Sequence, residues 1–341
     1  MKVDTGIGTQ LDKIPALARD IEGLGYDGVN TAETSHDPFL PLLLAAEHTD
    51  RIELRTSIAV AFARNPMNLA NLGHDLNAYS KGRFTLGLGS QIKPHITKRF
   101  SMPWGAPAAQ MRELVLAIRA IWANWYAGEP LQFVGEHYRH TLMTPAFTPE
   151  NTEYGAPKVV LAAVGPLMTE VAGEVADGMM IHPFSNVAYI ESVTLPALER
   201  GLAKAGRSRN DFELSYANFV VTGRDEAEFD ATMTTVKKRI AFYGSTPAYK
   251  GVLDAIGAGE LQSELNTMSK QGRWDEMGTL ISDEMVEAFG VVGEPKDIAA
   301  QMLARYSHIA DRTSASFPVA DADERQKIIQ ALRKGSALSQ K

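Results

Sequence analysis

The chain has no cysteine among its 341 residues. Disulfide bridges, thiolate metal sites, iron–sulfur clusters and cysteine nucleophiles are therefore excluded. The lack of cysteine says less about the cellular compartment of the protein. A chain that is 45% apolar can build a large core without disulfides in any compartment.

Positive charge is also scarce, with 34 Lys and Arg against 41 Asp and Glu and a formal net charge of −7. Nucleic acids and anionic membrane surfaces are bound through a basic face, so we expect neither as a partner. No apolar run approaches the roughly 20 residues that span a bilayer, and the first residues lack the apolar core of a signal peptide. These absences favour a soluble, cytoplasmic protein.

Several catalytic motifs are missing as well. The chain contains no GxxxxGK[ST] loop, no GxSxG elbow and no HExxH, and its eight histidines form no HxH at a strand end, so we predict no metal site. The first strand is followed by GIGTQLDK, which lacks the third glycine of GxGxxG, and the GLGS at 87–90 lies far along the chain. A doubly wound dinucleotide fold is therefore the weaker alternative.

What the chain does have is a regular alternation of strand-like and helix-like runs. Eight runs are strand-like: residues 3–8, 27–32, 52–60, 83–88, 158–163, 178–182, 212–222 and 312–318. Helical apolar spacing fills the gaps, for example at 11–24, 66–79, 110–127 and 166–176. This order predicts an α/β fold, a single (β/α)8 TIM barrel over residues 1–330, with its chemistry just past the carboxyl ends of the strands.

Two connections are too long for simple barrel loops. Residues 90–157, after strand four, include the hairpin-like LQFVGEHYRHTL, and residues 223–311, between strands seven and eight, are rich in helix formers. Such insertions commonly serve as lids, substrate walls or dimer surfaces. Residues 331–341 are expected to be a frayed, flexible tail.

The exit of strand two carries Glu33, His36 and Asp37. Histidine is suited to moving a proton near neutral pH, and a neighbouring carboxylate could orient it, so the three are candidate catalytic residues. The alternative is structural: Asp37 or Ser35 caps the helix that starts near Pro38, and His36 is merely exposed. The position at the top of the barrel favours the catalytic interpretation.

Strand three ends in RTSIAVAFARNP. Ser57 is difficult to explain as a core residue, whereas Ile58 fits an ordinary buried strand. Arg64 and Asn65 follow at the exit and could contact an anion or a ring carbonyl, or they could cap the helix that opens at Pro66.

The loop after strand four, QIKPHITKRF, holds Gln91, Lys93, His95, Lys98 and Arg99. In an acidic protein, a basic cluster on the active face favours an anionic ligand. The alternative is an ordinary solvated loop.

Strand five is followed by Val164, Gly165 and Pro166. The glycine allows close approach to the backbone, and the proline suits the first position of a helix, whose free N–H groups can bind phosphate. A routine turn between strand and helix would have the same sequence.

Five segments, taken in order over nearly the whole chain, resemble the bacterial luciferase-like monooxygenase superfamily. They are GYDGVNTAE, RIELRTSIAVAFARNP, LNAYSKGRFTLGLGS, MRELVLAIRAIW with FVGEHYRH, and GEVADGMMIH. Within it, AETSHDPF, AFARNP and LGSQIKPHI resemble the branch that uses the deazaflavin coenzyme F-420 more than the FMN monooxygenases.

The resemblance implies a barrel whose cofactor ring lies over the strand ends, with His36 and Asp37 beside it. It also implies a non-proline cis peptide at Ser57–Ile58 behind the ring. Phe39 and Leu40 stand where members of that branch often have a tryptophan.

The resemblance further implies a homodimeric oxidoreductase, acting without a metal, that moves a hydride between coenzyme F-420 and a small organic alcohol, carbonyl or activated alkene. His36 would be the acid or base and Asp37 its orienter. Gly165 would bind the cofactor's phosphate, and Lys93, Lys98 and Arg99 would suit its acidic tail. Two alternatives stay open: an FMN-dependent monooxygenase that receives reduced flavin from a separate reductase, and a cofactor-binding protein without catalysis.

Overall fold

The structure, a computed structural model, describes residues 1–314, 317 and 321–338. Its centre is a parallel sheet in the order β3-β2-β1-β13-β10-β9-β8-β5-β4, which closes because β3 also pairs with β5. β3 and β4 are successive segments of one barrel position, since both pair with β5, so the described strands form a closed eight-stranded barrel. The strands are β1 (Lys2–Gly6), β2 (Gly28–Thr31), β3 (Glu53–Thr56), β4 (Ala59–Val60), β5 (Phe84–Gly89), β8 (Lys158–Ala163), β9 (Gly178–Ile181), β10 (Glu213–Tyr216) and β13 (Arg312–Ser314). The predicted TIM barrel is confirmed.

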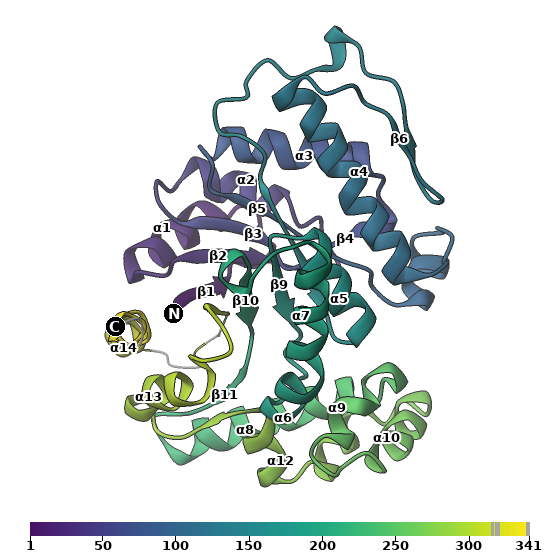
Figure 1. Cartoon of the computed structure of the whole chain (residues 1–341). Coiled ribbons are helices and arrows are strands. Elements are labelled where there is room, and N and C mark those ends of the chain that lie inside the picture. Colours follow the sequence, from purple (N-terminus) through teal and green to yellow (C-terminus); the bar gives the residue numbers. More distant parts are fainter. Residues whose placement is uncertain (315–316, 318–320, 339–341) are drawn as a thin grey trace.

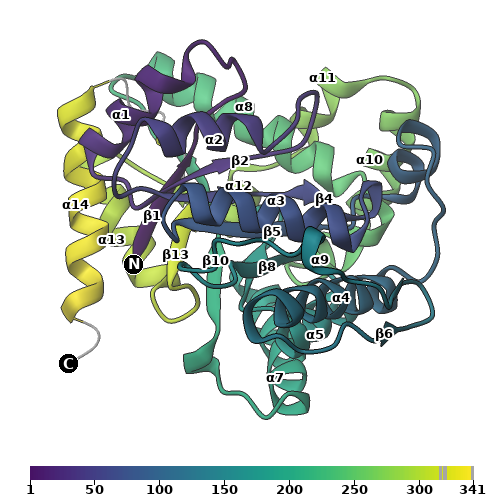
Figure 2. The ribbon, with the colours of Figure 1, turned by 90° about the horizontal axis from the view of Figure 1, so that it is seen from above.

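Helices surround the barrel (Figures 1 and 2). They are α1 (Ile14–Leu24), α2 (Leu40–Glu47), α3 (Pro66–Tyr79), α4 (Pro107–Ala127), α5 (Pro166–Val175), α6 (Val187–Tyr189), α7 (Leu195–Lys204), α13 (Pro295–Tyr306) and α14 (Ala322–Leu338). No helix in the described part of the chain is both long and apolar enough to cross a membrane.

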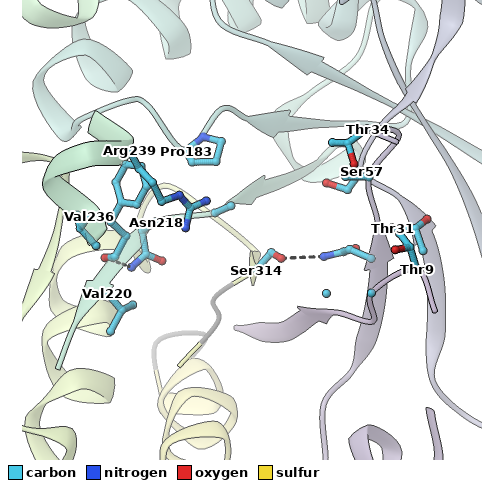
Figure 3. Close-up of a pocket in the computed structure, with 16 residues that line it drawn as sticks. Thr9, Thr31, Thr34, Ser57, Pro183, Asn218, Val220, Val236, Arg239 and Ser314 are labelled. Carbon is cyan, nitrogen blue, oxygen red and sulfur yellow. Dashed lines mark hydrogen bonds between the residues drawn. The ribbon is translucent and has the colours of Figure 1, made fainter. Parts of the chain in front are cut away.

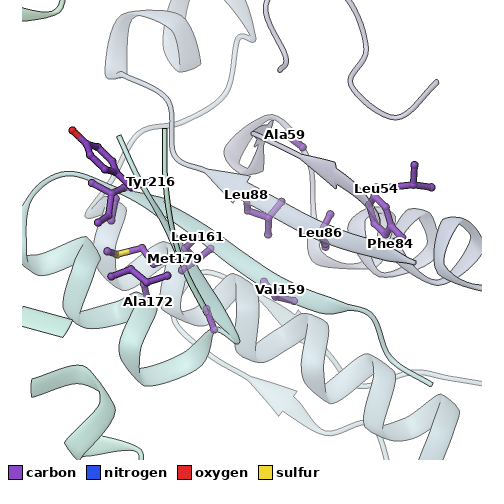
Figure 4. Close-up of a cluster of buried hydrophobic side chains, with 14 of the residues drawn as sticks. Leu54, Ala59, Phe84, Leu86, Leu88, Val159, Leu161, Ala172, Met179 and Tyr216 are labelled. Carbon is purple, nitrogen blue, oxygen red and sulfur yellow. The ribbon is translucent and has the colours of Figure 1, made fainter. Parts of the chain in front are cut away.

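The core lies between the outer face of the sheet and these helices (Figure 4). Leu54, Leu86, Leu88 and Leu161 are fully buried there, and β5 is buried at every position. Gly87 in β5 is required by close approach, because a Cβ at this position would lie 1.7 Å from the carbonyl oxygen of Thr56. Strands β3 and β5 can therefore pack tightly against each other at this position.

Strand three is interrupted, contrary to the single run predicted for residues 52–60. The ladder stops after Thr56, whose hydroxyl donates to the carbonyl oxygen of Gly87 (2.7 Å) and accepts from its N–H (2.8 Å). The Ser57–Ile58 peptide bond is cis, as the resemblance implied, and pairing with β5 resumes at Ala59.

Strand seven was also predicted too long, as residues 212–222. The barrel strand β10 ends at Tyr216, and β11 (Phe219–Val221) leaves the barrel to pair with β12 (Gly290–Val292) in a separate two-stranded sheet. The two intervening residues, Ala217 and Asn218, line a cavity instead of extending the ladder. Strand eight is β13, and most of the remainder of the predicted 312–318 run lies outside the described residues.

The two insertions form distinct structures. The first contains a small antiparallel hairpin, β6 (Phe133–Val134) and β7 (Arg139–His140), at the top of Figure 1. The second encloses its own apolar cluster at the bottom of the same view. Its helices are α8 (Glu226–Gly244), α9 (Lys250–Asp254), α10 (Leu261–Lys270), α11 (Trp274–Met277) and α12 (Asp283–Phe289).

The carboxyl-terminal segment is helical where a frayed tail was expected. Residues 331–338 continue α14, which packs against α1, α13 and β1, and Leu332 is fully buried. This apolar contact explains why the helix extends past the predicted limit, while residues 339–341 lie outside the described part.

A set of charged side chains occupies the lower end of the barrel, near the amino ends of the strands. This basal charge network consists of Asp4, Glu53, Arg55, Glu213 and Arg312. The Arg312 guanidinium, with 1% of its side chain exposed, pairs with Asp4 (2.6 Å) and Glu53, and Arg55 pairs with Glu213. Burial raises the pKa of Asp4. Burial would also raise that of Glu213, but Arg55 and Arg312 outweigh it and lower this pKa to about 2.

Candidate active site

A cavity of about 430 Å³ opens at the other end of the barrel, where the strands end; we call it the upper cavity (Figure 3). Volumes of this size are typical of small-molecule sites, and the carboxyl ends of barrel strands are where such sites occur. Its lining residues come from the exits of β1, β2, β3, β9, β10 and β13 and from α8: Gly6, Gly8, Thr9, Asn30, Thr31, Ala32, Thr34, Ser57, Pro183, Ala217, Asn218, Phe219, Val220, Val236, Arg239 and Ser314.

Asn30 is the most informative polar residue of the upper cavity. Its side-chain N–H donates to the Ser314 hydroxyl (2.8 Å), which links β2 to β13 (Figure 3). Only 8% of Asn30 is exposed, and its Oδ1 has no hydrogen-bond partner among the described residues. An unsatisfied buried carbonyl costs free energy, so this oxygen is available to accept a hydrogen bond from a ligand.

Ser57 lines the same cavity beside Thr34 (Figure 3). Its backbone N–H donates to the carbonyl oxygen of Thr31 (2.6 Å), which holds the start of the cis segment against β2. Of the residues predicted for the site, all of which lie in the described part of the chain, Ser57 alone lines this cavity.

Glu33, Arg64 and Asp37 form a connected group at the exits of strands two and three. Glu33, 9% exposed, accepts from the Arg64 guanidinium (2.6 Å) and from the backbone N–H of Val60 (2.7 Å). Arg64 also lies 3.4 Å from Asp37. Because its carboxylate is already bonded twice, Glu33 ties the two loops together, and Arg64 is neutralised by acidic neighbours.

Asp37 takes the structural role that the sequence left open. Its Oδ1 accepts from the backbone N–H groups of Phe39 (2.8 Å) and Leu40 (3.3 Å), at the start of α2. Both Asp37 and His36 lie in the described residues, and no hydrogen bond joins them. The imidazole of His36 is exposed on the loop that borders the cavity through Thr34. Asn65 likewise caps α3 by accepting from the N–H of Asn68 (3.0 Å).

The basic loop after β5 is exposed and lies outside the lining of the upper cavity. Lys93, His95, Lys98 and Arg99 all face solvent around a short π-helix, His95–Arg99. Gln91 accepts from the backbone N–H of Ile92 (3.0 Å). Arg99 donates to the carbonyl oxygen of Thr34, so this loop is fastened to the rim of the cavity.

Val164, Gly165 and Pro166 lie at the exit of β8, where α5 begins. A Cβ at Gly165 would meet nothing within 4 Å, so open space adjoins the backbone there. The carbonyl oxygen of Val164 accepts from the Tyr189 hydroxyl (3.2 Å), which anchors this turn to α6. The position is accessible to a ligand phosphate and is separate from the residues that line the upper cavity.

Sequence reasoning missed Asn30, Asn218, Arg239 and Ser314, and it set His182 aside. His182 ends β9 and accepts at Nδ1 from the N–H of Phe184 (3.0 Å), with its ring packed on Tyr243 and Tyr249. Burial, reinforced by the positive charge of Arg239, lowers the pKa of His182 to about 4. The ring is therefore neutral near pH 7. Among the described residues, no group of three or more His, Asp or Glu side chains could hold a metal ion.

Fold and cavity together define an α/β barrel with a small-molecule site at its strand ends. The chain belongs to the luciferase-like monooxygenase family, whose model matches residues 2–312. It is 55% identical to an uncharacterized protein of Mycobacterium tuberculosis over 323 residues, 95% of each chain. It is also 28% identical over 296 residues to the 5,10-methylenetetrahydromethanopterin reductase of Archaeoglobus fulgidus, covering 85% of this chain and 83% of that one.

A solved structure shares the fold over the whole length. The coenzyme F-420-dependent tetrahydromethanopterin reductase of Methanopyrus kandleri matches with a TM-score of 0.78 at 20% identity, covering 100% of this chain and 99% of the other. At that identity the likeness establishes the fold, and the chemistry must be argued from the residues.

Proposed function

We propose that the protein is a coenzyme F-420-dependent oxidoreductase that exchanges a hydride with a small organic alcohol, carbonyl or activated alkene. The observation that carries the proposal is the polar upper cavity, with its unsatisfied Asn30 oxygen, at the strand ends of this barrel. The reductase relatives support it, because the solved one is named as F-420-dependent.

The residues present fit such a cofactor. Open space at Gly165, before the free N–H groups of α5, could hold a phosphate, and Ser57 with its cis segment forms one wall of the upper cavity. When bound, coenzyme F-420 supplies a ring carbon that gives or takes a hydride.

The chain's own groups would orient the substrate and handle its proton. Asn30 Oδ1 can accept from a substrate hydroxyl, and the Ser314 hydroxyl, which already accepts from Asn30, is free to donate to a substrate oxygen. His36 remains our candidate for the proton, since its exposed ring makes no hydrogen bond to the residues that the structure describes. Glu33 and Asp37 hold the loop that carries it rather than the ring itself.

The second candidate is an FMN-dependent monooxygenase, which the family description favours. Such an enzyme must shelter an oxygen adduct from water, and the separate apolar cluster of the second insertion is a suitable cover. A cofactor-binding protein without catalysis is the remaining alternative.

Turnover assays separate these candidates. The purified protein is mixed with oxidised F-420 and a panel of alcohols, or with reduced F-420 and carbonyls or activated alkenes, and the visible absorbance of the oxidised cofactor is followed. We expect the absorbance of the oxidised cofactor to change when a substrate is present. Oxygen consumption with reduced FMN, and no reaction with F-420, would establish the monooxygenase instead.

We further propose that the enzyme works in the cytoplasm as a homodimer, with a separate reductase supplying reduced cofactor. Family resemblance supports the homodimer. Size-exclusion chromatography with light scattering measures the oligomeric state directly.

A further inference from the structure

Arg239 differs from the other residues that line the upper cavity because it is charged. It projects from α8 in the second insertion, and its guanidinium lies over the ring of Phe219, 5.2 Å from the centroid. Figure 3 shows it opposite Thr34 and Ser57, pointing toward the space between the two walls. The insertion therefore places a cation beside a cavity that the barrel itself surrounds with hydroxyl and amide groups.

Among the described residues, no carboxylate pairs with this cation. Within the described part of the chain, Arg239 makes no ion pair or hydrogen bond, and no other charged residue lines the cavity. By contrast, Arg64 and Arg312 are each paired with two or more carboxylates. The chain carries a net charge of −7, so an unpaired arginine beside the cavity stands out against the acidic character of the chain as a whole.

A second space meets the cavity at the same residue. This outer groove, about 450 Å³, is lined by Thr235, Lys238, Arg239, Phe242, Tyr243, Trp274 and Asp275. Lys238 is paired with Asp275 (2.7 Å), so the free positive charge of the groove also belongs to Arg239. Arg239 thus borders both the outer groove and the polar interior.

We propose that Arg239 binds an anionic group of the substrate, so that the enzyme acts on a small organic anion, a carboxylate or a phosphate ester. This inference rests on the proposed function for the reacting end of the substrate. The guanidinium offers two parallel N–H donors to either group, while Asn30 and Ser314 offer an acceptor and a donor to the oxygen on the carbon that exchanges hydride. A substrate with an anion at one end and an alcohol or carbonyl at the other would bond to Arg239, Asn30 and Ser314 together.

Binding to the protein without cofactor tests the anion site independently of catalysis. Ligand-observed NMR titrations compare pyruvate with acetone, which lacks the carboxylate, and dihydroxyacetone phosphate with dihydroxyacetone. We expect each anion to bind at least about ten-fold more tightly than its neutral counterpart. Arg239→Gln should remove that preference, and Arg239→Lys should restore part of it.

Lys237→Gln is the matched control, because it removes one positive charge from the same helix without lining either space; Lys237 pairs with Asp283. We expect this variant to keep the preference for both anions. Equal binding of anions and neutral counterparts by the wild type, or an unchanged preference in Arg239→Gln, would overturn the proposal.

A cofactor titration then distinguishes failure of this inference from failure of the proposed function. If Arg239 holds substrate, Arg239→Gln binds F-420 as the wild type does, and KM for an anionic substrate rises about ten-fold or more while kcat changes little. Weakened F-420 binding in this variant would assign Arg239 to the cofactor and overturn the inference alone. Anion selectivity without any F-420 binding by the wild type would instead overturn the proposed function.

Discussion

The two ends of the barrel treat polar side chains in opposite ways. At the lower end, the basal charge network encloses its charges and pairs them with one another, as Arg312 does with Asp4 and Glu53. At the upper end, Asn30 Oδ1 accepts no hydrogen bond and Arg239 makes no ion pair within the described part of the chain. Paired charges at the lower end stabilise the fold, whereas polar groups without a protein partner at the upper end cost some stability and are available to a ligand.

The largest expected effect is at the lower end. Arg312→Met would leave the carboxylate of Asp4 buried without its cation, so we expect the free energy of unfolding to fall by about 3–5 kcal/mol in urea denaturation. Arg200→Met removes an exposed arginine that pairs with Glu170 and should cost less than about 1 kcal/mol. Similar losses of unfolding free energy in the two variants would show that the buried Arg312 stabilises the fold no more than an exposed arginine does.

Acid should weaken the same network. The pKa of Glu213 is about 2 in the folded protein against an ordinary 4.5, so its stabilisation is complete above pH 4.5 and is lost as the pH falls toward 2. Protonation of Glu213 should lower the free energy of unfolding by an amount on the order of 3 kcal/mol. The difference in unfolding free energy between wild type and Glu213→Gln should shrink over that interval. A constant difference would show that Glu213 is not held ionised by Arg55.

Replacing the exposed histidine at the upper end should affect turnover and spare stability. We expect His36→Asn to lower kcat about 100-fold, as loss of a proton donor or acceptor does, with F-420 affinity nearly unchanged. His308→Asn, an exposed histidine that pairs with Glu191, is the control and should retain full turnover. Unaltered kcat in His36→Asn would remove that residue from the chemistry.

The smallest effect on stability is expected at Asn30. Asn30→Leu removes an unsatisfied oxygen along with one hydrogen bond to Ser314, so the free energy of unfolding should change by no more than about 1 kcal/mol. Turnover should nevertheless fall by about ten-fold or more. Asn77→Leu is the contrasting variant, because buried Asn77 donates to Gly155 (2.9 Å) and should lose about 1–3 kcal/mol. If Asn30→Leu lowers the free energy of unfolding as much as Asn77→Leu does, then Asn30 has a structural role.

The barrel could be predicted from the sequence because its signals are local. Each strand is a short apolar run that ends in polar or glycine-containing sequence, and each helix shows its own apolar spacing. Strand seven was extended wrongly because Phe219–Val221 has the same β-branched character as a barrel strand. Only the tertiary pairing of β11 with β12 shows where the chain leaves the barrel.

The site was predictable in part, for the same reason. Ser57 was detected because a hydroxyl interrupts an apolar strand, and it does line the cavity. Asn30 carried a comparable signal, a polar residue within the buried GVNT of β2, that went unused. Arg239 carried none, since an arginine on a helix with many charged residues is ordinarily solvated, and only the packing of α8 over the barrel brings it to the cavity.

Equilibrium titration of the protein with oxidised F-420 and with FMN, followed by fluorescence, measures whether the protein depends on F-420. F-420 dependence predicts saturable binding of this cofactor at least about ten-fold tighter than that of FMN. Tighter binding of FMN, or binding of neither cofactor, would contradict it.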